Sequence, residues 1–148
     1  MKNLVGGIVA GAAGTTALNV VTYLDMALRG RPASTTPEES VERLAEASGL
    51  DLGTGEQADN RKAGLGPLLG YGTGIGAGAL YGVLTRGRHL PYPAGALTLG
   101  ALAMIGSITP MTSLGLTDPR QWSVTDWISD VLPHLAYGMA AAAVYQRS

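Results

Sequence analysis

The sequence lacks cysteine, which excludes disulfide bonds, thiol chemistry and metal centres that depend on cysteine ligands. Charged residues are also scarce, at 14% of the chain against roughly 25% in soluble proteins. The net charge of −1 gives no electrostatic reason to bind nucleic acid, so no nucleic-acid partner is expected. Phenylalanine is absent, and the tyrosines and tryptophans tend to lie near the ends of apolar segments, as in membrane-interface belts.

Glycine, by contrast, is abundant and lies within apolar segments, most clearly in the uncharged stretch 65–84, LGPLLGYGTGIGAGALYGVL. In water each interior glycine would cost a helix about 1 kcal/mol relative to alanine. In a bilayer such a segment becomes helical, because its backbone must satisfy its own hydrogen bonds. Small residues four apart then form a groove that lets another helix, or a second copy, approach closely. The positions expected to pack helices are Gly7, Gly11, Gly66, Gly70, Gly74, Gly78 and Gly82.

Apolar runs predict four membrane spans, at about 4–24, 65–84, 94–114 and 127–145. The first is interpreted as a retained span rather than a signal peptide, because its apolar run is long and no convincing cleavage site follows it. We therefore predict an all-α fold, in which residues 1–148 form a single integral membrane domain built as a four-helix transmembrane bundle. Four spans place both termini on one side, together with the tight basic loop 85–92. The count of lysines and arginines favours the long loop between the first two spans as the cytoplasmic side.

One short amphipathic helix is expected in that long loop, at about 37–49. Thr36 is the predicted N-cap of a capping box, and Gly49 is a natural stop. The helix can lie on the membrane surface or cap the bundle, and the alternative is a docking site for a partner protein. Residues 51–64 are expected to form a flexible linker, and Pro67 is placed in the first turn of the next span.

Three local features are expected near the span ends. Asp25 lies at the end of the first span, with a flanking arginine as its simplest partner. Pro110 removes a backbone hydrogen bond from the third span and predicts a kink, where Ser107, Thr109 and Thr112 can bond the carbonyl freed on Gly106. Ser123 and Asp126 form a predicted capping box at the start of the fourth span.

One group of residues on the fourth span carries possible chemistry. Asp126, Asp130 and His134 are four residues apart and Tyr137 follows, so all lie on or near one helix face. Ionisable groups at this depth should face the bundle interior. They can form a proton relay, a metal site with little more than Asn19 to complete it, or a pocket for a headgroup or small ligand. The structural alternative is that Asp126 caps the helix, Asp130 is interfacial and His134 hydrogen-bonds a carbonyl or Tyr137.

These observations predict a non-enzymatic membrane protein, an accessory, assembly or interaction subunit. Its expected partners are membrane lipid and either another membrane protein or further copies of itself. No cofactor and no metal are expected, and no catalytic residue is assigned. No nucleophile–base pair is apparent, which gives hydrolase chemistry, including lipid modification, little support. The alternative function is a small transporter, or a proton or ligand conduit, that uses the face with Asp130 and His134.

Four segments of the chain resemble a known group of proteins. They are TPEESVERLAE, LGPLLGYGTGIGAGALYG, GSITPMTSLGLTDPRQWSVTDWISD and LPHLAYG. Together they resemble uncharacterised small integral membrane proteins of actinobacteria. The order of helices and the ending His-Leu-Ala-Tyr-Gly are more distantly similar to the YagU-like inner-membrane family of unknown function. The resemblance covers most of the chain and implies a multi-pass protein of the bacterial plasma membrane, but it transfers no catalytic residues.

Overall fold

A computed structural model describes residues 2–86, 88 and 90–148, without the side chain of Lys2. The predicted basic loop 85–92 therefore includes two residues, Gly87 and His89, that lie outside the described residues. Across the described residues the protein is helical without strands, which confirms the all-α prediction. The elements are α1 (Lys2–Arg29), α2 (Thr36–Ser48), α3 (Glu56–Thr85), α4 (Tyr92–Ser113), the short 3-10 helix η1 (Pro119–Gln121) and α5 (Val124–Tyr145).

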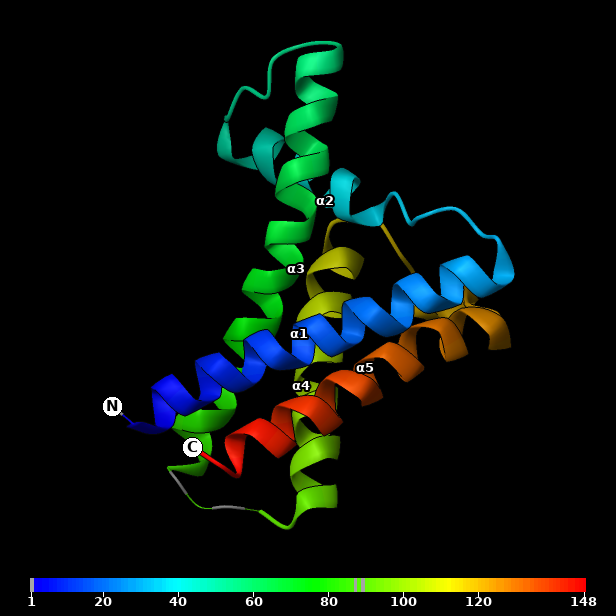
Figure 1. The fold of residues 1–148 in the computed structure, drawn as a ribbon. Helices are drawn as coiled ribbons and strands as arrows, with labels where there is room; N and C mark the ends of the chain where they lie inside the picture. Colours follow the sequence, from blue (N-terminus) through cyan, green and yellow to red (C-terminus); the bar gives the residue numbers. More distant parts are fainter. Residues whose placement is uncertain (1, 87, 89) are drawn as a thin grey trace.

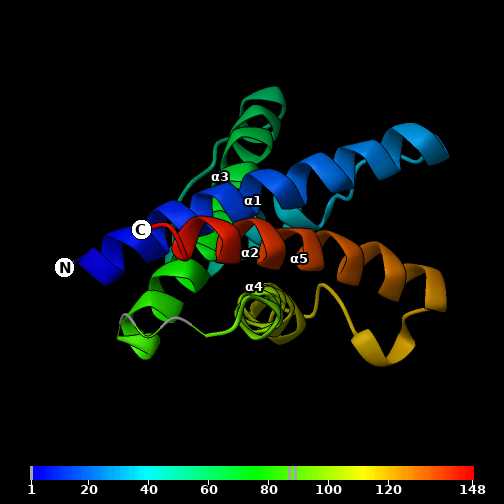
Figure 2. The same ribbon diagram turned by 60° about the horizontal axis from the view of Figure 1, so that its bottom comes forward.

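The four long helices form two antiparallel pairs that cross each other (Figure 1). In one pair α1 and α5 lie side by side, and in the other α3 and α4 run in opposite directions across them; Figure 2 shows α4 nearly end-on against α5. Both termini and the α3–α4 connection lie together at what we call the termini end. The end of α1, helix α2, the start of α3 and the α4–α5 connection lie at the opposite end, the loop end.

The contact between α1 and α3 is made by backbone against backbone. A Cβ atom built on Gly78 would overlap the carbonyl oxygen of Gly7 and lie 2.7 Å from the Cα of Gly11. One built on Gly11 would lie 2.6 Å from the carbonyl oxygen of Gly74, and Gly82 is equally close to the first turn of α1. Real Cβ atoms do not come this close, so the helices can cross here only because these positions carry no side chain.

The predicted glycine row does not form one continuous groove. Gly74, Gly78 and Gly82 face α1, whereas a Cβ on Gly66 would lie 3.1 Å from Pro37 of α2. A Cβ on Gly70 would meet no other part of the described protein within 4 Å. The glycine row therefore contacts two different helices, α1 and α2, and Gly70 contacts neither. The reason is that α1 crosses α3 and touches only about two of its turns.

A second close contact, between α4 and α5, uses small residues outside the predicted packing positions. A Cβ on Gly138 would overlap the carbonyl oxygen of Ala96, and one on Gly100 would lie 2.8 Å from the carbonyl oxygen of His134. The spacing of four between Ala96 and Gly100 is a small-residue signal that could have indicated this interface.

The interior is made of small residues and tyrosines, while large aliphatic side chains face outward. Tyr137 and Leu99 are the largest side chains that are fully buried. Of the described leucine, isoleucine and valine side chains, only Leu99 and Val41 are buried. Exposed examples come from α1 and α4, where Leu28 and Leu97 are 85% and 62% exposed. In a protein folded in water these residue types are the ones most often buried.

Two helices, α1 over Asn3–Arg29 and α4 over Tyr92–Ser113, are long and apolar enough to cross a membrane. They correspond to the first and third predicted spans. Helices α3 and α5 are long but less apolar by composition, since α3 contains many glycines and a polar first half and α5 carries Asp126, Asp130 and His134. Length and composition thus identify two candidate spans among the described helices rather than four.

The predicted amphipathic helix is present over Thr36–Ser48, and Gly49 ends it with a left-handed φ of 66°. The prediction of Thr36 as the N-cap is wrong, because Thr36 is already helical and Thr35 precedes the helix. The Thr35 hydroxyl donates a 2.6 Å hydrogen bond to the carboxylate of Glu39. Helix α2 packs on the first half of α3, so it covers the loop end of the bundle rather than standing free.

The prediction of a flexible linker over 51–64 is wrong for its second half. Helix α3 begins at Glu56, which places Pro67 inside the helix rather than in its first turn. The early turns are held by Lys62, which forms ion pairs with Asp59 at 3.2 Å and with Glu42 of α2 at 3.7 Å. The hydrogen bond to Asp59 is the main reason that the pKa of the Lys62 ammonium is raised. Contact with α2 therefore orders a polar stretch that has little apolar periodicity of its own.

The predicted partner of Asp25 is confirmed. Its Oδ2 accepts hydrogen bonds from Arg29 at 2.6 Å and from Arg31 at 2.7 Å. Arg29 also donates a 2.7 Å hydrogen bond to the hydroxyl of Ser129, which links the end of α1 to the start of α5. This polar cluster closes the loop end of the antiparallel α1–α5 pair.

The glycine contact predicts opposite effects for two alanine substitutions on α3. Gly78→Ala should destabilise the protein by about 1–3 kcal/mol, because the new methyl group overlaps the α1 backbone. Gly76→Ala, two residues earlier and facing open space, should be neutral or stabilising by up to about 1 kcal/mol through helix propensity. Thermal unfolding in detergent micelles, followed by circular dichroism, measures both, and equal stability of the two variants would contradict the contact.

Candidate functional site

The start of α5 is set by its capping box, as predicted. The hydroxyl of Ser123 accepts a hydrogen bond from the backbone N–H of Asp126 at 3.2 Å. The Asp126 carboxylate accepts in return from the Ser123 hydroxyl at 2.7 Å and from its backbone N–H at 2.9 Å. These hydrogen bonds, the hydroxyl one above all, lower the pKa of Asp126. Asp126 therefore has the capping role that the structural alternative assigned to it.

Two turns further along α5, the imidazole of His134 is buried between α5 and α4, with the residue 8% exposed. Its Nδ1 lies 2.7 Å from the backbone carbonyl oxygen of Asp130. A carbonyl oxygen can only accept, so Nδ1 carries the proton and Nε2 is the free acceptor of the neutral ring. The Oγ of Ser107 on α4 lies 3.4 Å from that Nε2.

The carboxylate of Asp130 completes this arrangement on the other side of the ring. Its Oδ2 lies 3.6 Å from Nδ1 of His134. The same oxygen is shielded from solvent and has no hydrogen-bond partner among the described residues. A shielded carboxylate oxygen without a donor is costly, and a second proton on the imidazole would give it a close counter-charge. We call the set Ser107, His134 and Asp130 the polar chain.

The polar chain joins a hydroxyl, an imidazole and a carboxylate in that order. The Ser107 hydroxyl donates to the carbonyl of Met104 at 3.0 Å and can turn toward His134. The hydroxyl lies at the long limit of hydrogen-bond distance from the ring, and the carboxylate can stabilise the charged form of the ring. The same order is that of a nucleophile, a base and an orienting acid. The order alone does not make a nucleophile–base pair, because the Ser107 hydroxyl donates to Met104 and lies 3.4 Å from Nε2, so the expectation that no such pair is present stays a prediction.

The other predicted members of the site lie elsewhere. Tyr137 is completely buried, and its hydroxyl donates a 2.6 Å hydrogen bond to the carbonyl oxygen of Gly74 on α3. Its ring packs on Gly14 of α1, where a Cβ would lie 2.7 Å from ring carbons. Tyr137 therefore joins three helices and does not contact His134 by a hydrogen bond. Asn19 is half-buried on α1, and its side chain makes no hydrogen bond to a described residue.

Of the five predicted candidates, only Asp130 and His134 come together. Within the described part of the chain, no three histidine, aspartate or glutamate side chains are grouped as metal ligands. Ser107 is the member that the sequence pattern does not indicate, since its predicted role is only to bond the carbonyl freed by Pro110. It lies 27 residues before His134, and no spacing rule links residues on separate helices.

Comparison of the chain with models of known families, with curated proteins and with solved structures gives no match. The resemblance to actinobacterial membrane proteins and to the YagU-like family therefore stays a prediction. What the fold and the site define is an all-α protein with a partly buried hydroxyl–imidazole–carboxylate chain between two helices.

The geometry predicts the tautomer of His134. With His89→Gln as background, which leaves one histidine, ¹⁵N NMR of the neutral ring should show the proton on Nδ1, because this atom faces the Asp130 carbonyl oxygen. Ser107→Ala should leave this tautomer unchanged, since Ser107 lies at Nε2. A neutral ring that is protonated on Nε2 would contradict the arrangement.

Proposed function

We propose that this chain is an integral membrane protein in which α1, α3, α4 and α5 all span the bilayer. The outward position of the large aliphatic side chains supports the proposal, because a bilayer solvates them and water does not. Helix α3 carries no charged residue from Leu65 to Leu84, which fits a span despite its glycines. The resemblance to small membrane proteins of actinobacteria favours the bacterial plasma membrane as the location.

Within the membrane, the function that the geometry supports best is a proton or ligand conduit that uses the polar chain. The observation that carries this proposal is the shielded Oδ2 of Asp130, which has no hydrogen-bond partner in the described part of the chain and lies 3.6 Å from Nδ1 of His134. Ionisable groups among membrane helices are costly and mark proton or ion pathways. A histidine that faces both a hydroxyl and a carboxylate can accept a proton from one side and release it to the other.

The test is proton flux into liposomes that contain the purified protein and a pH-sensitive dye. His134→Ala should abolish flux, because the ring that connects Ser107 and Asp130 is lost. Ser107→Ala should lower flux, whereas Ser113→Ala should not. Ser113 is the matched control, since its hydroxyl also donates to a carbonyl on α4 but makes no hydrogen bond to a described histidine.

Circular dichroism must show that each variant keeps the helical fold. Wild-type flux in His134→Ala would end the conduit proposal. Absence of flux in the wild-type protein over the same proton gradient would also count against it, and would favour the second candidate below.

The second candidate is a non-enzymatic accessory or assembly subunit that binds another membrane protein or its own copies. One observation favours it: a face of α3 stays open beside the glycines used for internal packing. Cβ atoms on Gly72 and Gly76 would meet no other part of the described protein within 4 Å, and exposed Leu69 and Leu80 flank them on the helix. Open small residues four apart, bordered by leucines, are typical of helix–helix contacts in membranes.

Native mass spectrometry of protein extracted gently from its own membrane tests the second candidate. We expect a complex heavier than the monomer, and Gly76→Leu should remove it without lowering monomer stability. Gly64→Leu is the control, because Gly64 is also open but lies in the polar first half of α3. A bare monomer for the wild-type protein would contradict an accessory role.

A further inference from the structure

The two ends of the molecule differ sharply in charge. All eleven acidic residues lie between Asp25 and Asp130 in the sequence, on segments that the fold gathers at or toward the loop end (Figure 1). Among the residues that the structure describes, the termini end carries basic residues and no acidic one. Its lysine and arginines are Lys2, Arg86, Arg88 and Arg147. Negative charge is therefore in excess at the loop end and positive charge at the termini end, although the net charge of the whole chain is only −1.

Basic side chains at the loop end are largely neutralised locally. Arg29 and Arg31 share Asp25, and Arg120 pairs with Asp118 at 2.9 Å. At the termini end the situation is different. Arg86 and Arg88 make no ion pair and no side-chain hydrogen bond with any residue that the structure describes.

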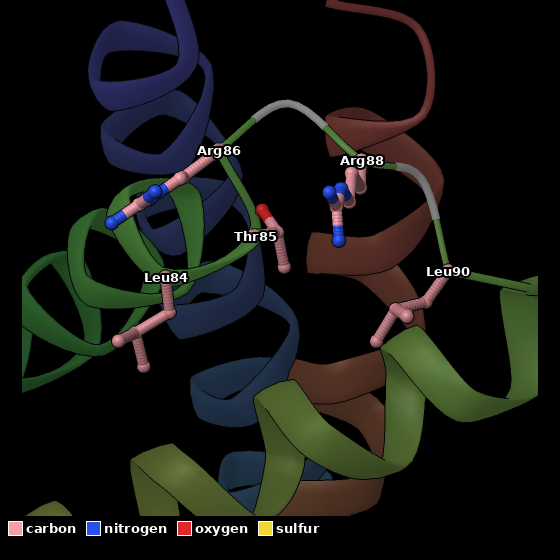
Figure 3. A pocket seen from close by; sticks show the side chains of 5 residues that line it. All are labelled: Leu84, Thr85, Arg86, Arg88 and Leu90. Atoms are coloured by element: carbon pink, nitrogen blue, oxygen red, sulfur yellow. The ribbon is translucent and has the colours of Figure 1, made fainter.

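These two arginines border a cavity of about 480 Å³ at the α3–α4 connection (Figure 3). Leu84 and Leu90 supply apolar walls, and Thr85 lies between them. Figure 3 shows the Arg88 side chain pointing into the gap between Thr85 and Leu90, while Arg86 extends toward the side of Leu84. The cavity thus combines guanidinium groups with exposed aliphatic side chains.

The local backbone holds this arrangement in place. Arg86 ends α3 in the left-handed conformation, with φ of 50°, and the backbone N–H of Arg88 donates a 2.8 Å hydrogen bond to the carbonyl of Thr85. The Thr85 hydroxyl donates to the carbonyl of Tyr81 at 2.9 Å and also lies 2.9 Å from the hydroxyl of Tyr145 on α5. The wall between the two arginines is therefore fixed to the bundle.

We propose that this cavity binds the phosphate of an anionic phospholipid, with Arg88 at the phosphate, Arg86 adding positive charge at the rim, and Leu84 and Leu90 along the start of the acyl chains. The proposal rests on the membrane location proposed above. Guanidinium groups match phosphate oxygens in charge and geometry. Basic pockets at the ends of membrane helices bind anionic headgroups, and apolar walls next to them suit lipid rather than a free ion. The excess of positive charge at the termini end complements a negatively charged leaflet.

The test is native mass spectrometry of the full-length protein in detergent, titrated with phosphatidylglycerol, with phosphatidylcholine and with inorganic phosphate. The wild-type protein should bind phosphatidylglycerol in preference to phosphatidylcholine. The double variant Arg86→Gln/Arg88→Gln should bind phosphatidylglycerol about 30-fold more weakly. The control Arg43→Gln/Arg120→Gln removes the same charge from exposed positions at the loop end and should bind as the wild-type protein does.

Equal binding of phosphatidylglycerol by the two double variants would overturn the proposal. Displacement of the lipid by an equal concentration of inorganic phosphate would also overturn it, because the ligand would then be the free ion. Should the double variant fail to fold, the single variant Arg88→Gln is compared with the wild-type protein in the same titration.

A separate wash of the membranes with alkaline carbonate tests the membrane location first. Release of the protein overturns the membrane proposal and the lipid site together. A protein that is retained but shows no lipid preference overturns only the site.

Discussion

The structure depends on the backbone contact between α1 and α3. Gly7 and Gly11 face Gly74 and Gly78 so closely that no side chain fits between them. Because α1 and α3 cross at this point, the carbonyl of Gly74 is placed where the hydroxyl of Tyr137 can reach it. The crossing thereby fixes α5 as well, since the Tyr137 ring fills the space beside α1. One contact that requires glycine thus determines how three of the four long helices meet.

The polar chain depends in turn on the neighbouring α4–α5 contact. Gly100 allows α4 to approach the backbone of His134, and Ser107 lies two helical turns further along the same helix. If α4 were held further away, the 3.4 Å distance from Ser107 to the imidazole would lengthen. Asp130 and His134 are neighbours on α5 by helical spacing alone, but the third group is supplied by packing. Close approach of helices through small residues therefore determines both the α1–α3 crossing and the position of Ser107 beside His134.

The two ends of the bundle differ in how their charged side chains are paired. At the loop end, Arg29 and Arg31 pair with Asp25, Lys62 with Asp59 and Arg120 with Asp118, so most basic side chains of this end have an acidic partner. The arginines at the α3–α4 connection have no such partners in the described protein and border a cavity with apolar walls. The bundle thus presents an end with an excess of acidic residues and an end whose charged residues are all basic.

The sequence by itself determined the helices, because local signals specify them. Apolar runs predicted α1, α4 and α5 to within a few residues, Ser123 and Asp126 predicted the start of α5, and Gly49 predicted the end of α2. The glycines expected to pack helices were selected by their spacing of four, and several of them do lie at helix contacts.

Only the tertiary structure decided which helix each glycine meets, that residues from Glu56 onward join α3, and that Ser107 lies at His134. The physical reason is that these features depend on contacts between segments far apart in the chain. Helical periodicity specifies which residues share a face, but it does not specify what that face will touch. For Glu56 onward the deciding contact is with α2, and for Ser107 it is the approach of α4 to α5 through Gly100.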